Sequence, residues 1–330
     1  MNILNALGIF GLGCALVACQ AKSESGKNTP QDNLMIEWEA TLYSEMQNQL
    51  GEGAIYNHET KEFWHIDIEG KQFFTTDIKT KAQQSYDVGE RIGTIVPNDL
   101  GQAVVALQNG LFTYDLESKT KKLIVNPLDT ITNIRFNDGK CDPAGRLWVG
   151  SMGLEQKANR ASLYSLDQGE VKKQLDSITI SNGIVWSKDQ KTMYYIDTPN
   201  EHVKAYDYEV STGKISNGRV VVEIGGIGYP DGMAIDSEDM LWIALWNGNM
   251  VGRWDPDTGK LIGKINVPAH NITSCAFVGE ELDSLVITSA RVDMSDEELE
   301  SYPLAGSLFV AVPGVKGVKS VFYKTPVAVQ

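Results

Sequence analysis

Three short segments of the sequence place one oxygen-bearing side chain directly before a glycine, at the point where an apolar strand is predicted to begin. The oxygen-bearing residues are Glu52 in Gly-Glu-Gly, Asn182 in Ser-Asn-Gly and Asp231 in Pro-Asp-Gly. Each glycine lets the backbone bend close to whatever the polar side chain holds. Two carboxylates and one amide are hard oxygen ligands, which suit Ca²⁺ or Mg²⁺, and Ca²⁺ best tolerates an irregular shell completed by water.

The alternative is that these segments are turns. A single Asn-Gly or Asp-Gly pair is most often a hairpin turn. Three such segments at matching positions favour one convergent site over three separate turns. The sequence has no Cys or His pattern for a zinc-selective site, and its four histidines have neither metal nor catalytic-triad spacing. A serine hydrolase is disfavoured because no Gly-x-Ser-x-Gly segment is present.

A repeated strand pattern supplies the elements that must position these residues. Turns rich in Asp, Gly, Pro or Asn lead into short aromatic and β-branched segments whose starts are about 40 to 50 residues apart, the spacing of propeller blades. These segments are Glu62–Asp67, Gln102–Leu107, Arg146–Gly150, Thr192–Asp197, Met240–Leu245 and Ser284–Ser289. All but the first of these six segments are followed by a second strand pattern.

The pattern predicts an all-β fold, a six-bladed β-propeller with four-stranded antiparallel blades around a central channel. A pair of β-sandwiches is the competing interpretation. One domain is expected over residues 34–330, with Ile36–Ala40 closing the ring against the last blade. Residues Asp296–Glu300 suggest a short helical turn. Cys141 and Cys275 are interpreted as small buried residues, although a disulfide between them is not excluded by the sequence.

The first 33 residues indicate export. Residues 1–18 form an apolar stretch of signal-peptide length, and Leu16-Val17-Ala18-Cys19 resembles the lipobox of bacterial lipoproteins. We therefore expect Cys19 to carry lipid, residues 19–33 to be a flexible tether, and the protein to sit in the bacterial cell envelope. The residue after Cys19 is not Asp, which in this class of lipoprotein is typical of the outer membrane, facing the periplasm. The alternative is an ordinary cleaved signal peptide, which would release a soluble protein.

Composition limits the partners. The chain has 330 residues and is 42% hydrophobic, so it can bury a sizeable core. Its net charge is −14. The acidic balance argues against nucleic acid as a partner, because phosphate backbones require Lys and Arg. It suits cation binding, but it is also compatible with simple solubility. No feature of the sequence identifies a protein partner.

As a set, the polar segments resemble the regucalcin and gluconolactonase family, also called the senescence marker protein family. The resemblance covers nearly the whole chain after the tether. It is carried by Arg135–Lys140 with Asp142–Arg146, by Ser181–Gly183 and Pro230–Met233, and by Thr273–Phe277. It implies one divalent metal ion held at the positions of Glu52, Asn182 and Asp231. Ca²⁺ is the expected ion, with Zn²⁺, Mg²⁺ and Mn²⁺ as alternatives.

The resemblance also implies a substrate and roles for its binding residues. Arg135, Asn137 and Glu155 match positions that hold sugar hydroxyls, and Glu155 is the looser match. The expected reaction is hydrolysis of an aldonolactone such as gluconolactone, with Asp231 as the general base or the metal itself activating the water. Two alternatives remain open, namely a different hydrolase such as a phosphotriesterase, and a non-catalytic propeller that binds calcium or sugar.

Overall fold

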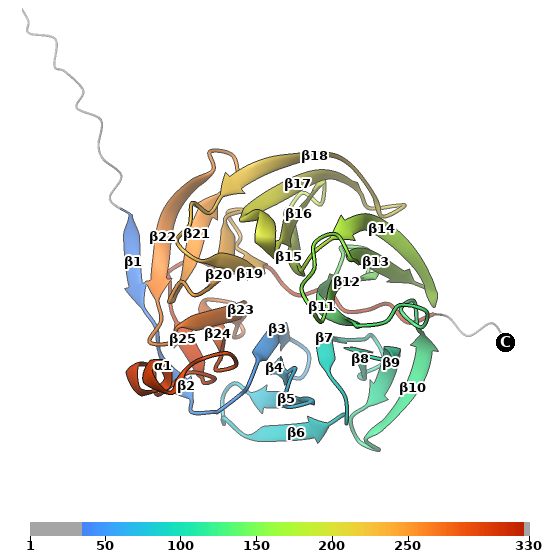
Figure 1. Ribbon diagram of the computed structural model, residues 1–330, viewed down its shortest axis with the longest axis horizontal. Coiled ribbons are helices and arrows are strands. Elements are labelled where there is room, and N and C mark those ends of the chain that lie inside the picture. Colours follow the sequence, from blue (N-terminus) through green and yellow to red (C-terminus); the bar gives the residue numbers. More distant parts are fainter. Residues whose placement is uncertain (1–34, 327–330) are drawn as a thin grey trace, which may run out of the picture. The chain divides into compact units, whose positions relative to one another are not determined.

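Alternating apolar and polar residues between Gly- and Asp-rich turns give the chain a structure made almost entirely of strands. The computed structural model describes residues 35–326, which form 25 strands and one short α-helix. The strands make six sheets, antiparallel except for one added edge strand, arranged as a ring around a common axis, as Figure 1 shows. The predicted six-bladed β-propeller is therefore confirmed.

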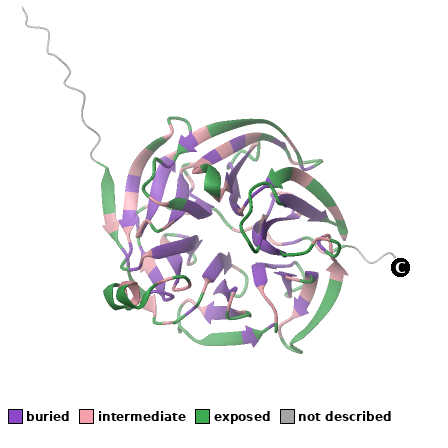
Figure 2. Ribbon diagram, viewed as in Figure 1, coloured by how far each residue is buried: buried purple, intermediate pink, exposed green. Residues whose placement is uncertain are grey.

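The inner strand of each blade lies nearest the axis and is almost entirely buried (Figure 2). The inner strands of blades 1 to 6 are, in order, β3 (Gly51–Asn57), β7 (Ile92–Pro97), β11 (Ile134–Cys141), β15 (Ser181–Trp186), β19 (Tyr229–Ile235) and β23 (Asn271–Val278). The second strands are β4 (Glu62–Asp67), β8 (Ala103–Leu107), β12 (Leu147–Gly153), β16 (Thr192–Asp197), β20 (Leu241–Trp246) and β24 (Ser284–Ala290). These second strands are the aromatic and β-branched segments that repeat in the sequence.

The third and outer strands complete each blade and become progressively more exposed (Figure 2). The third strands are β5 (Gln72–Asp77), β9 (Gly110–Asp115), β13 (Ala161–Asp167), β17 (His202–Glu209), β21 (Met250–Asp255) and β25 (Leu308–Ala311). The outer strands are β6 (Gln83–Asp87), β10 (Thr120–Val125), β14 (Glu170–Ile178), β18 (Lys214–Glu223), β22 (Lys260–Asn266) and, for blade 6, β2 (Thr41–Ser44).

The ring is closed by the start of the described chain, but not by the segment we expected. Strand β2 pairs antiparallel with β25 and so completes the last blade. The preceding strand β1 (Ile36–Glu39) instead pairs parallel with β22 and adds a fifth strand to blade 5. The prediction that Ile36–Ala40 closes the last blade is therefore wrong by about one strand. Trp38 explains the shift, because its ring packs 5.6 Å from that of Trp242 in blade 5.

All six inner strands begin at the same end of the ring, because contacts between neighbours join positions near their starts. Examples are the hydrogen bond from Thr273 in β23 to the carbonyl of Gly51 in β3 (2.5 Å) and the close approach of Gly183 in β15 to Asp231 in β19. We call this end the site face. The loops that precede the inner strands, and the loops between second and third strands, therefore lie on it.

The opposite end of the ring is crossed by the C-terminal segment. Gly317 donates its backbone hydrogen bond to Leu282, and Tyr323 donates to Pro97, both of which follow or end inner strands. This segment lines a cavity of about 160 Å³ together with Cys141 and Cys275. Both cysteines are buried and free, as small core residues would be.

The short helix α1 (Asp296–Ser301) confirms the predicted helical turn and is closed by a capping box between Ser295 and Glu298. No helix within residues 35–326 is long and apolar enough to cross a membrane. The predicted signal peptide, Cys19 and the tether lie outside the described residues.

Candidate metal centre

The carboxyl groups of Glu52 and Asp231 meet on the axis of the ring. They belong to blades 1 and 5, which are not neighbours, yet their side chains are within hydrogen-bonding reach of each other. Both residues are buried, with 7% and 6% of their surface exposed. Burial raises the pKa of Glu52 to about 8, with a further contribution from the charge of Asp138. Burial, followed by repulsion from Glu52, raises the pKa of Asp231 well above its usual range.

Asn182 faces the same space from blade 4 and is fixed by hydrogen bonds on both sides of its amide. Its Oδ1 accepts from Nδ2 of Asn137 at 2.9 Å, and its Nδ2 donates to Thr198 Oγ1 at 2.7 Å. Thr198 in turn donates to the carbonyl of Pro230 at 2.8 Å, directly before Asp231. The amide of Asn182 is therefore held by Asn137 of blade 3 and by Thr198 of its own blade, which in turn is fixed to Pro230 of blade 5.

Asn137 connects Asn182 to Arg135. Nη1 of Arg135 donates to Oδ1 of Asn137 at 2.6 Å and to the carbonyl of Phe136 at 2.9 Å. Because the amide oxygen of Asn137 is occupied in this way, its Nδ2 is directed at Asn182 Oδ1 and at the carbonyl of Ser181. Burial lowers the pKa of Arg135 to about 10, and the charges of Glu69 and Glu52 oppose that shift.

A β-bulge explains why each of these side chains points to the axis. The pairing between inner and second strands shifts register between Glu52 and Ile55, between Phe136 and Gly139, between Ser181 and Ile184 and between Pro230 and Met233. The shift in β3 begins at Glu52, the shift in β11 spans Asn137 and Asp138, and the other two span Asn182 and Asp231. A bulge redirects a side chain that regular alternation would place on a blade face. The irregularity therefore recurs at equivalent positions and brings the polar groups together.

The glycines that follow the polar residues have two different roles. Gly53 has a φ of +62°, a conformation that favours glycine. Gly183 and Gly232 do not adopt a positive φ, but each lies against a neighbouring inner strand. A Cβ on Gly183 would lie 2.8 Å from the carbonyl oxygen of Asp231, and one on Gly232 would lie 2.8 Å from that of Thr273. Close packing of inner strands, more than a tight turn, requires these two glycines.

Asp138 is a buried carboxylate near the site that the sequence analysis did not select. Its charge acts on both Glu52 and Asp231. On its other side lies Lys140, whose Nζ donates to the carbonyl of Met233 at 2.8 Å and whose charge lowers the pKa of Asp138 against the rise caused by burial. In the sequence, Asp138 stands between Asn137 and Gly139 and looks like part of a turn. Only the bulge in β11 shows that the segment continues as a strand.

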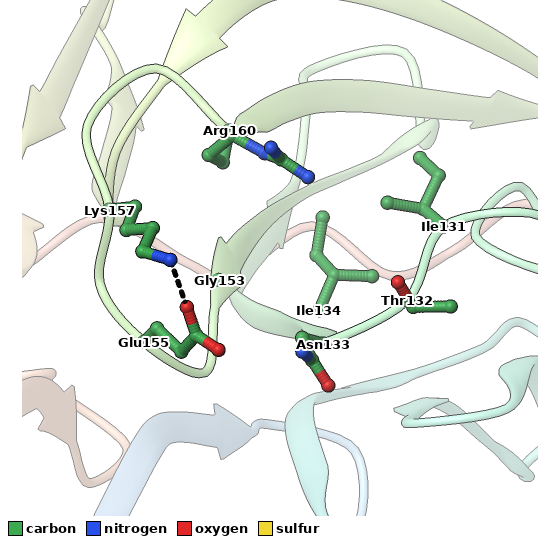
Figure 3. Close-up of a pocket in the computed structure, with 8 residues that line it drawn as sticks. All are labelled: Ile131, Thr132, Asn133, Ile134, Gly153, Glu155, Lys157 and Arg160. Atoms are coloured by element: carbon green, nitrogen blue, oxygen red, sulfur yellow. Dashed lines mark ion pairs between the residues drawn. The ribbon is translucent and has the colours of Figure 1, made fainter.

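Glu155 lies apart from this hydrogen-bonded group. It belongs to the loop between β12 and β13, its side chain is 53% exposed, and its carboxylate pairs with Lys157 at 2.5 Å (Figure 3). Together with Arg160 and residues of the loop before β11, it lines a pocket on the site face. The structure thus brings together Glu52, Asn137, Asn182 and Asp231, with Arg135 beside them, and places Glu155 in an adjoining pocket.

The donor set suits a hard divalent cation. Two buried carboxylates that repel each other require either a shared proton or a cation between them. The neighbouring amide of Asn182 offers a third oxygen donor, which is uncharged. Within residues 35–326, no group of three or more His, Cys, Asp and Glu side chains is arranged around a metal position. The candidate site has only two such side chains among its proposed ligands, Glu52 and Asp231, because its third donor is the amide of Asn182.

The fold is a six-bladed propeller with buried carboxylate and amide groups at the starts of its inner strands, and comparison with known proteins identifies the family to which it belongs. Residues 50–291 match the model of the SMP-30/Gluconolactonase/LRE-like region. The chain therefore belongs to this family.

Individual relatives agree with this assignment over most of the chain. Regucalcin of Danio rerio is 37% identical over 282 residues, which cover 84% of this chain and 95% of the relative. YvrE of Bacillus subtilis (strain 168) is provisionally named a sugar lactone lactonase. It is 35% identical over 275 residues, which cover 83% of this chain and 94% of the relative. The crystal structure of regucalcin from Agrobacterium tumefaciens, titled a calcium-binding protein, has a TM-score of 0.83 at 27% identity and covers 87% of this chain and 98% of its own.

Proposed function

We propose that this protein is a metal-dependent sugar lactonase that hydrolyses an aldonolactone such as gluconolactone. The observation that carries the proposal is the meeting of Glu52 and Asp231 on the axis, with Asn182 held beside them. The family description, which includes gluconolactonase, and the provisional naming of YvrE as a sugar lactone lactonase support the same reaction class.

Glu52, Asn182 and Asp231 would hold the divalent cation, with Ca²⁺ as the expected ion and Mg²⁺, Mn²⁺ and Zn²⁺ as alternatives. Carboxylate and amide oxygens are ligands that Ca²⁺ accepts readily, and water completes its shell. When bound, the cation supplies Lewis-acid stabilisation of the negative charge that develops on the lactone carbonyl oxygen. Asp138 adds negative potential without being required as a ligand.

The chain's own residues supply positioning and proton transfer. Arg135 and Asn137 are buried and fix each other's orientation, so the remaining guanidinium donors of Arg135 and the second lone pair of Asn137 Oδ1 are held in place for ring hydroxyls. Glu155 would contact the hydroxyls farther from the axis. Water attacks the carbonyl carbon while Asp231 accepts one of its protons. The ester C–O bond then breaks, the ring oxygen takes up a proton, and the open hydroxy acid leaves.

The direct test is lactone hydrolysis after chelation and after re-addition of Ca²⁺, Mg²⁺, Mn²⁺ or Zn²⁺. We expect turnover of D-glucono-1,5-lactone to disappear with the chelator and to return with at least one ion. Asp231→Asn should abolish turnover, whereas Asp257→Asn, an exposed acid on an outer turn, should leave it unchanged. Full activity of the Asp231 variant would refute the role of this residue.

The same assay separates the alternatives. A phosphotriesterase would hydrolyse paraoxon and not the lactone under the same metal. A non-catalytic propeller would bind the cation, detected by calorimetry, and turn over neither compound with any of the four ions.

We further propose that the protein is lipid-anchored through Cys19 in the bacterial cell envelope, with the propeller on the periplasmic side of the outer membrane. The support is the sequence Leu16-Val17-Ala18-Cys19 after an apolar stretch, together with the residue that follows it. Metabolic labelling with palmitate should mark the wild-type protein in the membrane fraction. The Cys19→Ala variant should carry no label, and label on that variant would exclude this residue as the anchor.

A further inference from the structure

A pocket of about 190 Å³ lies on the site face between two loops of blade 3 (Figure 3). Thr132 and Asn133 line it from the loop before β11, and Glu155, Lys157 and Arg160 line it from the loop between β12 and β13. In Figure 3 the side chains of Arg160 and Glu155 extend from the two ends of one loop, opposite Asn133. Most of the groups around the pocket are therefore polar.

The pocket adjoins the residues proposed to bind the lactone. Its lining includes Ile134 and Gly153, which are paired in the ladder between β11 and β12. The next pair in that ladder is Arg135 with Met152. Since a strand advances about 3.3 Å per residue, the pocket begins within a few ångströms of Arg135 along the strand and roughly 10 Å from Asn137. This separation is comparable with the reach of an extended six-carbon sugar acid.

The charges in the pocket leave one cation free. Lys157 and Glu155 form an ion pair at 2.5 Å and neutralise each other. Arg160 takes part in none of the ion pairs found within residues 35–326, although it lines the same pocket. The pocket thus has a formal charge of +1 in a chain whose net charge is −14. A guanidinium fork presents two parallel N–H donors, which match a carboxylate or phosphate.

We propose that this pocket binds an anionic group at the far end of the substrate, so that the preferred lactones carry a terminal carboxylate or phosphate. The proposal rests on the proposed lactonase function and narrows its substrate class. Arg160 receives the anionic group, Asn133 and Thr132 supply neutral hydrogen-bonding groups beside it, and Lys157 remains with Glu155. A neutral aldonolactone lacks the group that Arg160 would bind.

The test compares D-glucono-1,5-lactone with two acidic counterparts, D-glucaro-1,4-lactone and 6-phospho-D-glucono-1,5-lactone. We expect wild-type kcat/KM to be higher for at least one acidic lactone, and which one identifies the carboxylate or the phosphate as the recognised group. Arg160→Gln should lower kcat/KM for the preferred acidic lactone by about tenfold, which corresponds to the loss of one charge-assisted hydrogen bond. The kcat/KM of the variant for the neutral lactone should stay within about twofold of the wild-type value. Lys122→Gln, which removes an exposed cation from an outer strand, should change neither value.

Binding of the open-chain products provides a readout that does not need turnover. D-glucarate or 6-phospho-D-gluconate should bind more tightly than D-gluconate in calorimetry, and Arg160→Gln should remove the difference. If every lactone is inert but this Arg160-dependent preference is present, the lactonase proposal fails and the anion pocket stands. If lactones are hydrolysed but Arg160→Gln leaves the ratio of acidic to neutral substrates unchanged, the anion pocket is refuted and the lactonase stands.

Discussion

Glu52 and Asp231 lie within hydrogen-bonding reach of each other although they belong to non-adjacent blades, and no basic side chain within residues 35–326 is hydrogen-bonded to either buried acid. Such a pair is costly without a cation, because each carboxylate is desolvated and repels the other. A functional site of this kind lowers the stability of the metal-free protein.

Asp231→Asn should therefore stabilise the metal-free protein while removing its response to metal. The amide keeps the shape of the side chain and avoids both the desolvation of a carboxylate and its repulsion by Glu52, so we expect the free energy of unfolding in EDTA to rise by about 1 kcal/mol. Wild type should gain thermal stability when Ca²⁺ is added, because the ion binds the folded state. Thermal denaturation with and without Ca²⁺ measures both effects. A variant that still responds fully to Ca²⁺ would contradict the ligand assignment.

Gly183→Ala should separate β15 from β19. The added Cβ would lie 2.8 Å from the carbonyl oxygen of Asp231 and 2.7 Å from the Cβ of Met233, and the first of these belongs to the backbone. We expect a loss of about 1–3 kcal/mol in the free energy of unfolding, together with weaker metal binding. Gly153→Ala is the matched control, because its Cβ would meet nothing closer than 3.8 Å. Equal stabilities of the two variants in urea denaturation would refute the close-packing argument.

Asn137→Ala should weaken metal binding although Asn137 is not among the proposed ligands. The substitution leaves Oδ1 of Asn182 and the carbonyl of Ser181 without their donor, at a cost of about 1–3 kcal/mol in stability. Loss of a group that orients a ligand typically lowers metal affinity by about 10–100-fold. Calorimetric titration with Ca²⁺ tests this expectation. Asn200→Ala, at an exposed position, should bind Ca²⁺ as the wild type does.

Stability should fall in mild acid partly because of His65. Its ring is fully buried and stacked on Phe74, with centroids 4.7 Å apart, and burial lowers its pKa to about 3. The neutral ring is favoured in the folded state, whereas the unfolded residue has a pKa of about 6.5. The contribution of neutral His65 to the free energy of unfolding is therefore complete above pH 6.5. It is lost as the pH falls from 6.5 towards 3, by at most about 1.4 kcal/mol per pH unit.

His65→Gln cannot gain that proton, so its unfolding free energy should decrease less steeply across the same pH range, even if it is lower at pH 7. Urea denaturation at intervals between pH 7 and pH 4 provides the comparison. Parallel curves for wild type and variant would show that His65 does not contribute to the acid sensitivity.

The repeat and the family resemblance were readable from the sequence because they depend on local chemistry. Aromatic and β-branched runs such as Thr192–Asp197 form strands wherever they pack, and their regular spacing already required six similar units. Burial of Cys141 and the helical turn near Asp296 followed from equally local signals. The segment at Ile36 misled because its strand pattern does not specify a partner, and packing of Trp38 on Trp242 selected blade 5.

The three proposed ligands were also selected from the sequence, since a polar residue before glycine at the start of a strand recurs at equivalent blade positions. Their geometry, however, depends on tertiary structure. Bulges in separate blades turn Glu52, Asn182 and Asp231 towards the axis, and closure of the ring brings side chains of the first and fifth blades together past blade 6. Tertiary structure also separates Glu155 from Asn137 and places Asp138 close to the two acids. Residue types determined which atoms could bind a cation, but only the packing of the six blades determined which of them meet, because contacts across the axis have no signature in local sequence.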